Sequence, residues 1–127
     1  MYITMIEGIG VDIIEIGRIR EVITRWGDTF LNRIFTDSEL AYCRSRKNFY
    51  HHIAARFAAK EAVGKALAIG WSSVFRWRDV EILNEVSGQP KVILHSELKK
   101  LLANRHIVLS LSHSSVHVIA TAVIERE

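Results

Sequence analysis

Hydrophobic and polar residues alternate at the start of the chain, which predicts a β-strand over Ile3–Ile14. The two faces of this strand differ in character. Branched residues occupy one face and small or acidic residues the other, namely Ile9, Val11 and Ile13 against Gly8, Gly10 and Asp12. Glycine weakens a strand unless something has to approach its backbone closely. The second face is therefore expected to lie against a neighbouring group.

Helical spacing follows in three segments before any second strand. Ile16–Trp26 is the first, and its apolar residues are expected to face the core: Ile16, Ile19, Ile23 and Trp26. The second begins with a capping box, Thr36 with Glu39, and runs through Arg44. The third is long, covers His51–Ala68 and ends at Gly70. This part of the chain is therefore predicted to be mainly helical.

The spacing then returns to strands. The predicted elements are a strand over Phe75–Leu83, a turn at Ser87–Pro90, a strand over Lys91–Leu94, a short helix over Ser96–Ala103 with Ser96 as N-cap, and a strand pair over Ile107–Glu125 that turns near Ser114. This order predicts an α+β fold in which an antiparallel sheet packs against one long helix. No repeat or linker interrupts residues 1–127, so a single domain is expected.

The long helix has an unusually small apolar face. Small residues share one stripe, namely Ala55, Ala59, Ala62, Val63 and Ala66, so the helix backbone is expected to lie close to the sheet. Glu61 and Lys65 lie outside this stripe, four residues apart, and this spacing permits a salt bridge within the helix. Such a surface pair contributes little stability. A plain helix pair is therefore one interpretation of these two residues.

The other interpretation of Glu61 is a metal site shared with Asp12. A few hard oxygen ligands, completed by water and a substrate phosphate, are what Mg²⁺ requires. Lys60 and Lys65 are then expected to neutralise phosphate charge. Because 49 residues separate the two acids, spacing alone leaves both interpretations open.

Composition limits the class of partner. The 127 residues carry a net charge of +3, but acidic and basic residues are interspersed, so an anionic ligand fits better than a nucleic acid duplex. Cys43 is the only cysteine, and a half-buried free thiol in a reducing compartment is expected. The start of the chain does not resemble a signal peptide, and Ile107–Ile124 is too polar to span a membrane. A cytoplasmic protein without a membrane partner is expected.

Six short motifs occur in an order that is typical of one enzyme family: GIGVDIIEIGRI, FTDSEL, ARFAAKEAVGKAL, WRDVEI, GQP and LSLSHS. Together they extend from about Glu7 to Ala122. In this set the chain resembles holo-acyl-carrier-protein synthase, the small bacterial type of 4′-phosphopantetheinyl transferase. The resemblance implies transfer of the 4′-phosphopantetheine arm of coenzyme A to a serine of apo-acyl carrier protein, with release of adenosine 3′,5′-bisphosphate. It also implies a requirement for Mg²⁺ and a homotrimer with active sites at subunit interfaces.

The resemblance also assigns roles at matching positions. Asp12 and Glu61 match the metal ligands of the family, and Lys65 matches a lysine that contacts the pyrophosphate region. His113 matches a histidine near the coenzyme A site. The expected catalytic residues are thus Glu61, Lys65 and His113. A metal-bound water, Glu61 and His113 each stay open as the group that deprotonates the acceptor serine.

Two further regions are assigned by the resemblance. Gly88 and Pro90 match a loop near the nucleotide. Arg18 and Arg25, with Val22 between them, match the basic helix that binds the carrier protein. The apolar residues on both faces of the last strand agree with a trimer, because a second subunit can cover one of the faces.

Other interpretations compete with this one. A basic RNA-binding module would use the many arginines, but the aromatic residues expected on an RNA-binding sheet are missing from the pattern. A relative that binds coenzyme A without turnover is disfavoured because Asp12, Glu61 and Lys65 are all present. Asp79 and Glu81 form a second carboxylate pair, which is interpreted as an exposed strand face.

Overall fold

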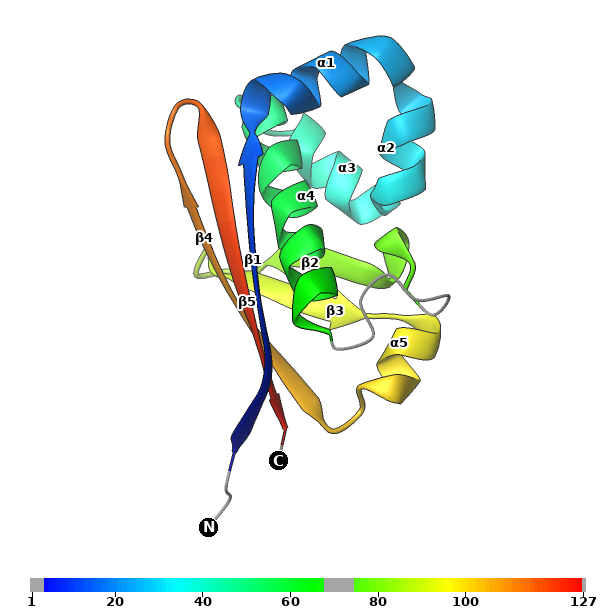
Figure 1. Ribbon diagram of the computed structural model, residues 1–127. Helices are drawn as coiled ribbons and strands as arrows, with labels where there is room; N and C mark the ends of the chain where they lie inside the picture. Colours follow the sequence, from blue (N-terminus) through cyan, green and yellow to red (C-terminus); the bar gives the residue numbers. More distant parts are fainter. Residues whose placement is uncertain (1–3, 68–74, 127) are drawn as a thin grey trace.

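The computed structural model describes residues 4–67 and 75–126, in which helices cover one side of a long antiparallel sheet (Figure 1). The predicted α+β class is therefore confirmed. In chain order the elements are β1 (Met5–Glu15), α1 (Ile16–Trp26), α2 (Asp28–Ile34), α3 (Asp37–Arg44), α4 (Phe49–Ala66), a 3₁₀ turn (Trp77–Asp79), β2 (Val80–Asn84), β3 (Pro90–Leu94), α5 (Ser96–Leu101), β4 (Arg105–His113) and β5 (His117–Arg126).

The strands form two separate sheets. The larger sheet has the order β1-β5-β4, so the first strand of the chain pairs with the last. Its register places Asp12 opposite Ala120 and Ala120 opposite Leu111. β2 and β3 form a two-stranded hairpin by themselves. The predicted closing strand pair and the predicted hairpin are both confirmed.

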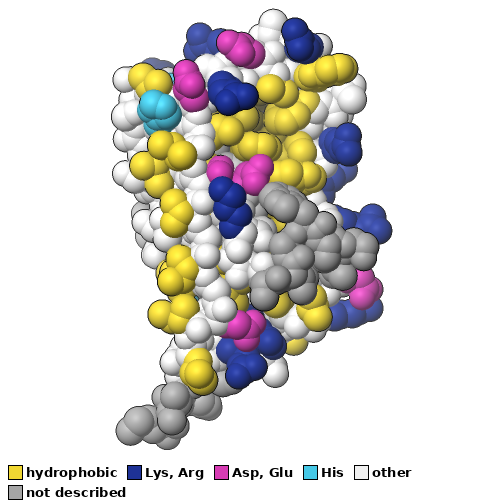
Figure 2. All heavy atoms as spheres, viewed as in Figure 1, with side chains coloured by type: hydrophobic (Ala, Val, Ile, Leu, Met, Phe, Trp, Pro, Cys, Tyr) yellow, Lys and Arg dark blue, Asp and Glu magenta, His cyan; other side chains and the backbone are white. Residues whose placement is uncertain are grey.

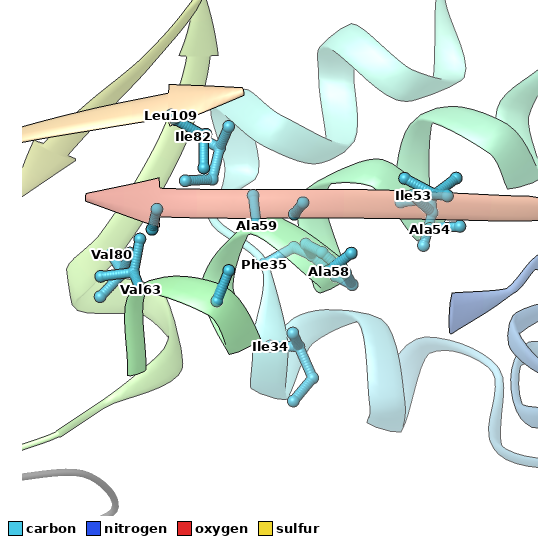
Figure 3. Close-up of a cluster of buried hydrophobic side chains, with 14 of the residues drawn as sticks. Ile34, Phe35, Ile53, Ala54, Ala58, Ala59, Val63, Val80, Ile82 and Leu109 are labelled. Carbon is cyan, nitrogen blue, oxygen red and sulfur yellow. The ribbon is translucent and has the colours of Figure 1, made fainter. Parts of the chain in front are cut away.

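Helix α4 is the centre of the core. It packs on β1 and β5 on one side and on α3 and β2 on the other, and for this reason it is buried on several faces (Figures 1 and 3). The predicted alanine stripe does face the sheet side, and Ala59, Ala62 and Val63 are fully buried. The helix extends over Phe49–Ala66 instead of His51–Ala68, and the expected terminator Gly70 lies outside the described residues.

The helical part of the chain differs from the prediction in two respects. Among the described residues, four α-helices precede β2 instead of the predicted three, and the one that was not predicted is α2. Gly27, with φ of 53°, ends α1 and begins α2 in one residue, so the two helices are separated by a sharp bend. Trp26, expected in the core, is 60% exposed at the last position of α1. The capping box of Thr36 and Glu39 at the start of α3 is confirmed.

The second part of the chain requires smaller corrections. β2 begins at Val80, because the residues before it form a 3₁₀ turn, so the strand predicted from Phe75 was too long. Ser96 is not an N-cap: His95 holds that position, and Ser96 is the first helical residue, with φ of 56°. Pairing of β3 with β2 ends at Leu94, so His95 is the one residue between strand and helix and takes the cap position.

Two further expectations from the sequence concern the cysteine and the membrane. Cys43 is fully buried, more than expected, and burial raises the pKa of its thiol to about 11, so the thiol is unreactive at neutral pH. Within the described ranges, no helix is both long and apolar enough to cross a membrane.

Candidate active site

The glycine face of β1 lies directly against α4. A Cβ atom added at Gly10 would come within 1.9 Å of the Ala62 carbonyl oxygen, and one at Gly8 would meet the Ala66 carbonyl oxygen at the same distance. Real Cβ atoms never approach so closely. The glycines thus serve the contact between strand and helix, and the close approach expected from the sequence is made by helix backbone.

Asp12 follows these glycines on the same face and meets charged residues of α4. The Lys65 ammonium group lies 2.9 Å from Asp12 Oδ1 and also donates to the Val11 carbonyl oxygen at 3.1 Å. The helix pair of Glu61 with Lys65 is therefore not the observed pairing. Lys65 instead bridges from helix to strand.

Glu61 completes this cluster. Burial raises the pKa of its carboxyl group, the negative charge of Asp12 raises it further, and Lys65 opposes both effects. Glu61 and Asp12 are thus close enough to repel each other. The structure brings Asp12 of β1 together with Glu61 and Lys65 of α4, two elements that are far apart in the sequence.

The donor set of this cluster suits a hard divalent cation. It offers two carboxylates whose mutual repulsion a cation would relieve. Among the described residues, no group of three or more acidic, histidine or cysteine side chains is arranged to hold a metal ion. A site with two protein ligands leaves most coordination positions to water and phosphate, as Mg²⁺ sites commonly do. The residues present therefore fit Mg²⁺ better than a metal that needs a protein cage.

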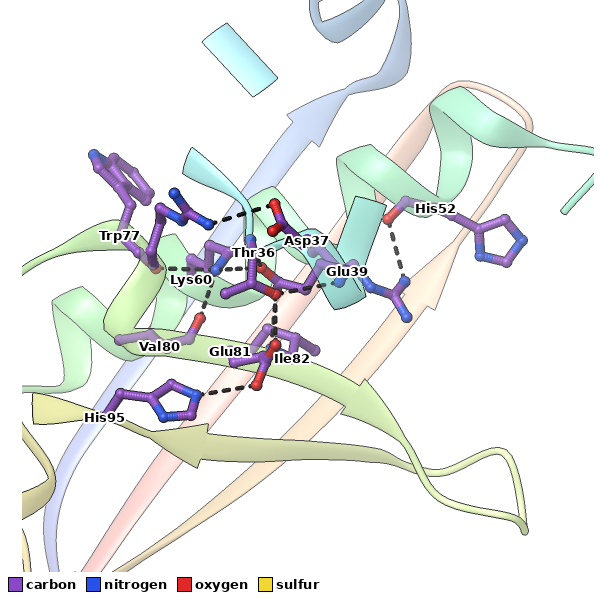
Figure 4. A network of polar contacts seen from close by, with 12 residues as sticks. Thr36, Asp37, Glu39, His52, Lys60, Trp77, Val80, Glu81, Ile82 and His95 are labelled. Atoms are coloured by element: carbon purple, nitrogen blue, oxygen red, sulfur yellow. Dashed lines mark hydrogen bonds and ion pairs between the residues drawn. The ribbon is translucent and has the colours of Figure 1, made fainter. Parts of the chain in front are cut away.

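Lys60 does not belong to this cluster, contrary to expectation. It is completely buried and forms an ion pair with Glu39 at 2.9 Å on the opposite side of α4 (Figure 4). Its ammonium group cannot reach a phosphate at Asp12 and Glu61. Adjacent positions on a helix point about 100° apart, and here this angle separates a buried lysine from an accessible acid.

Glu81 is likewise buried, so the exposed carboxylate face predicted for Asp79 and Glu81 is wrong. Burial by itself would raise the Glu81 pKa, but hydrogen bonds from Thr36 and His95 outweigh burial and lower it. Thr36 Oγ1 donates to Glu81 Oε2 at 2.5 Å, and His95 Nε2 lies 3.0 Å from Glu81 Oε1. The partners of Glu81 are distant in sequence, which is why the pattern did not reveal them.

The other predicted site residues lie elsewhere in the chain's fold. His113 is the last residue of β4, on the far side of β5 from β1, and its ring contacts the ring of His51 at 6.4 Å between centroids. Gly88, with φ of 91°, lies in the turn between β2 and β3, and Pro90 begins β3. One chain therefore does not bring His113, Gly88 and Pro90 to the Asp12 cluster.

A groove beside the cluster was not predicted. Its lining comes mainly from β1, α1, α2 and α4, with one residue of β5, and includes Ile14, Arg18, Val22, Phe30 and Phe57. Figure 2 shows hydrophobic side chains gathered next to acidic and basic ones on the face that β1 and α4 share. The feature of the sequence that could have indicated this groove is Phe57, which lies four residues before Glu61 and therefore on the same side of the helix.

Of the three residues expected to bind a partner, two line this groove. Arg18 and Val22 do so, whereas Arg25 lies with Val22 and Trp26 along a second hollow on the same helix. The basic face of α1 is therefore continuous with the groove through Val22.

The face of the large sheet that points away from α4 carries uncovered apolar side chains. Ile9, Val11 and Ile13 of β1 are each more than half exposed, and Val108 and Ile119 continue the patch on the other two strands. A column of hydrophobic side chains is visible along this side of the molecule in Figure 2. Exposed apolar surface of this extent is typical of an interaction site.

Comparison with known proteins gives a consistent result. The sequence model of the 4′-phosphopantetheinyl transferase superfamily matches residues 8–122. A holo-[acyl-carrier-protein] synthase of Protochlamydia amoebophila is 49% identical over 116 residues, which cover 91% of this chain and 95% of that protein. The crystal structure of the holo-[acyl-carrier-protein] synthase from Neisseria meningitidis superposes with a TM-score of 0.88 at 32% identity, covering 94% of this chain and 98% of that one. The Helicobacter pylori enzyme in complex with coenzyme A gives 0.82 at 31% identity, covering 91% and 98%.

Proposed function

Because the chain belongs to the 4′-phosphopantetheinyl transferase superfamily, we propose that it transfers the 4′-phosphopantetheine arm of coenzyme A to a serine of apo-acyl carrier protein. Adenosine 3′,5′-bisphosphate is the second product. The observation that carries this proposal is the meeting of Asp12, Glu61 and Lys65 where β1 crosses α4. The whole of residues 1–127 acts as a single transferase domain, in the cytoplasm.

The three residues have distinct tasks in this reaction. Asp12 and Glu61 would hold Mg²⁺, which when bound offsets negative charge on the pyrophosphate of coenzyme A. Lys65 adds a positive charge that is half exposed and can turn from Asp12 towards a phosphate oxygen. Phosphoryl transfer depends mainly on positioning and electrostatics, so a site with few catalytic side chains is sufficient.

The proton of the acceptor serine has three candidate destinations: a water, Glu61 or His113. The raised pKa of Glu61 belongs to the metal-free site, and a Mg²⁺ ion held by the same carboxylate would lower that pKa and weaken Glu61 as a base. His113 can take part only from a neighbouring subunit, since within one chain it lies beyond β5.

The groove on α1 suits the carrier protein. Phe57 lies in the groove and one helical turn before Glu61, so a protein bound there presents its serine close to the acidic pair. Arg18 and Arg25, with the apolar Val22 between them, provide positive charge for an acidic carrier.

The proposed enzyme is a homotrimer, and the surface that one chain leaves uncovered supports assembly. The outer sheet face exposes Ile9, Val11 and Ile13, and burial against other copies would remove this apolar surface from water. The same assembly would bring His113, Gly88 and Pro90 of one copy to the Asp12 cluster of another, so each coenzyme A site would lie at a subunit interface. Light scattering should return three chains per particle, and a stable, fully active monomer would contradict the trimer.

Intact-mass measurement tests the reaction itself. Incubation with coenzyme A, Mg²⁺ and an apo-acyl carrier protein should add one phosphopantetheine group to the carrier. Chelation of Mg²⁺ should prevent the addition, and so should replacing the acceptor serine by alanine. Binding of coenzyme A without a mass change would indicate a non-catalytic relative, and binding of RNA in its place would indicate the basic binding module.

Charge reversal on α1 tests carrier binding separately. Arg18→Glu should raise the KM for the carrier about tenfold at low salt and much less at high salt, because screening weakens exposed charges. Affinity for coenzyme A should stay the same. Lys99→Glu on the exposed side of α5 is the matched control, and an equal effect of both variants would show that only net charge matters.

A further inference from the structure

A fully buried polar network lies directly behind the proposed active site. At its centre the Lys60 ammonium group contacts three acceptors: Glu39 Oε1 at 2.9 Å, the Trp77 carbonyl oxygen at 3.0 Å and the Val80 carbonyl oxygen at 2.6 Å. All of the hydrogen-bonding capacity of an ammonium group is thus used. Figure 4 shows these contacts joining α4 to α3 and to the start of β2.

Glu39 extends the network to the strand. Its Oε1 also accepts from the Thr36 backbone N–H at 2.8 Å, and its Oε2 accepts from the Ile82 backbone N–H at 2.9 Å. Both side chains of the Lys60 and Glu39 pair are completely buried. A buried pair with this many fixed partners defines the position of α4 relative to β2 more strictly than apolar packing does.

The other side of α4 is held just as closely, two residues further along. The carbonyl oxygen of Ala62 lies 1.9 Å from the position that a Cβ atom on Gly10 would take, so β1 and α4 are in backbone contact there. Glu61 stands between these two fixed positions. It is therefore flanked by a polar contact to β2 through Lys60 and by a backbone contact to β1 through Ala62.

We propose that Lys60 is a positioning residue for the transferase reaction: by holding α4 to Glu39, Trp77 and Val80, it keeps the Glu61 carboxylate turned towards Asp12. This inference rests on the proposed function. With Lys60 removed, α4 keeps its packing on β1 and β5 but loses its buried polar contact to α3 and to the start of β2. It can then rotate or shift enough to separate the two carboxylates. Partners that hold a metal ligand in place are commonly worth about 10- to 100-fold in metal affinity or activity.

The simpler alternative is that Lys60 only neutralises buried Glu39. Lys60→Met alone does not separate the two roles, because the unpaired Glu39 charge would also destabilise the whole fold. The double variant Glu39→Gln/Lys60→Met removes this charge together with the lysine. Ile53→Ala is the matched control, since it loosens the buried face of the same helix two turns earlier and leaves both contacts beside Glu61 intact.

Two measurements decide the question. The first is a titration of the substrate-free protein with Mg²⁺, in which the melting temperature reports binding. The second is the turnover of coenzyme A at varied Mg²⁺ concentration. We expect the double variant to need about 10- to 100-fold more Mg²⁺ and to lose kcat, with the KM for the carrier unchanged. Ile53→Ala should melt earlier but respond to Mg²⁺ as the wild type does.

The outcomes are distinct. If the double variant binds Mg²⁺ as the wild type does and keeps its kcat, Lys60 only balances charge and the proposal is overturned. Absence of Mg²⁺ binding by the wild type would overturn it as well. A wild type that binds Mg²⁺ but transfers nothing would overturn the proposed function, and the titration alone would still decide the positioning role.

Discussion

Helix α4 contributes to two charged regions that behave in opposite ways. On one side, Lys60 enters a buried network with Glu39 in which the charged groups have several fixed partners. On the other side, Glu61 and Lys65 meet Asp12 in an accessible cluster where two acids share one half-exposed lysine. The same residue types therefore serve the fold in one place and are available to a ligand in the other.

The difference between the two regions is seen in one acid of each, Glu81 on β2 and Glu61 on α4. Hydrogen bonds hold the pKa of Glu81 below its ordinary value, whereas burial and the charge of Asp12 raise that of Glu61. Glu81 has its partners within the chain, but Glu61 has an excess of nearby negative charge that a proton or a bound cation would balance. Unrelieved repulsion of this kind is a cost to stability and is typical of a functional site.

The largest expected effect is a difference in stability between variants of the two α4 lysines, Lys60 and Lys65. Lys60→Met should lower the free energy of unfolding by about 3–5 kcal/mol, because it leaves a buried carboxylate unpaired. Lys65→Met should change it by less than about 1 kcal/mol, because the pair with Asp12 is partly exposed. Urea denaturation of both variants measures the difference. Equal losses would show that the accessible cluster also supports the fold.

The second largest effect on stability is expected where β1 contacts α4. Gly10→Ala should cost about 1–3 kcal/mol or more, because the added methyl group would overlap the Ala62 carbonyl oxygen and force strand and helix apart. Gly17→Ala is the matched control on α1, where nothing lies within 4 Å, and it should gain about 0.5–1 kcal/mol. Thermal unfolding of the two variants should therefore shift in opposite directions.

A smaller effect is expected at the edge of the buried network. Thr36→Ala removes the N-cap of α3 and the hydrogen bond to Glu81, which should cost about 1–2 kcal/mol. Thr24 donates its hydroxyl only to a helix carbonyl on the surface, so Thr24→Ala should be neutral within a few tenths of a kcal/mol. If both variants unfold alike, the Thr36 hydroxyl contributes nothing specific.

The smallest effect concerns pH. Folded Glu61 keeps its proton to higher pH than unfolded Glu61, so the free energy of unfolding should fall as pH rises from the ordinary carboxyl range through the raised pKa. Glu61→Gln should remove this dependence and make the metal-free protein slightly more stable above that range. Added Mg²⁺ should stabilise the wild type increasingly over the same range, since it competes with the proton. Denaturation at a series of pH values tests all three points.

Much of the fold and part of the candidate site could be predicted from the sequence. Periodicity is a local property, so it identified the long helix, the hairpin, the closing strands and the capping box of α3. The ordered motifs indicated the family and, through it, Asp12, Glu61 and Lys65. Local patterns also explain the errors: a one-residue break at Gly27 hid α2, and the end of α1 left Trp26 exposed.

Only the tertiary structure decided which charges face water and which partners they meet. Lys60 and Glu61 are neighbours in sequence, yet one is buried and the other accessible, because α4 lies between two different layers. The contacts of Lys65 with Asp12 and of Glu81 with Thr36 and His95 join segments 14 to 53 residues apart. A side chain's burial and its pKa depend on everything packed around it, and that environment is formed only when distant segments come together.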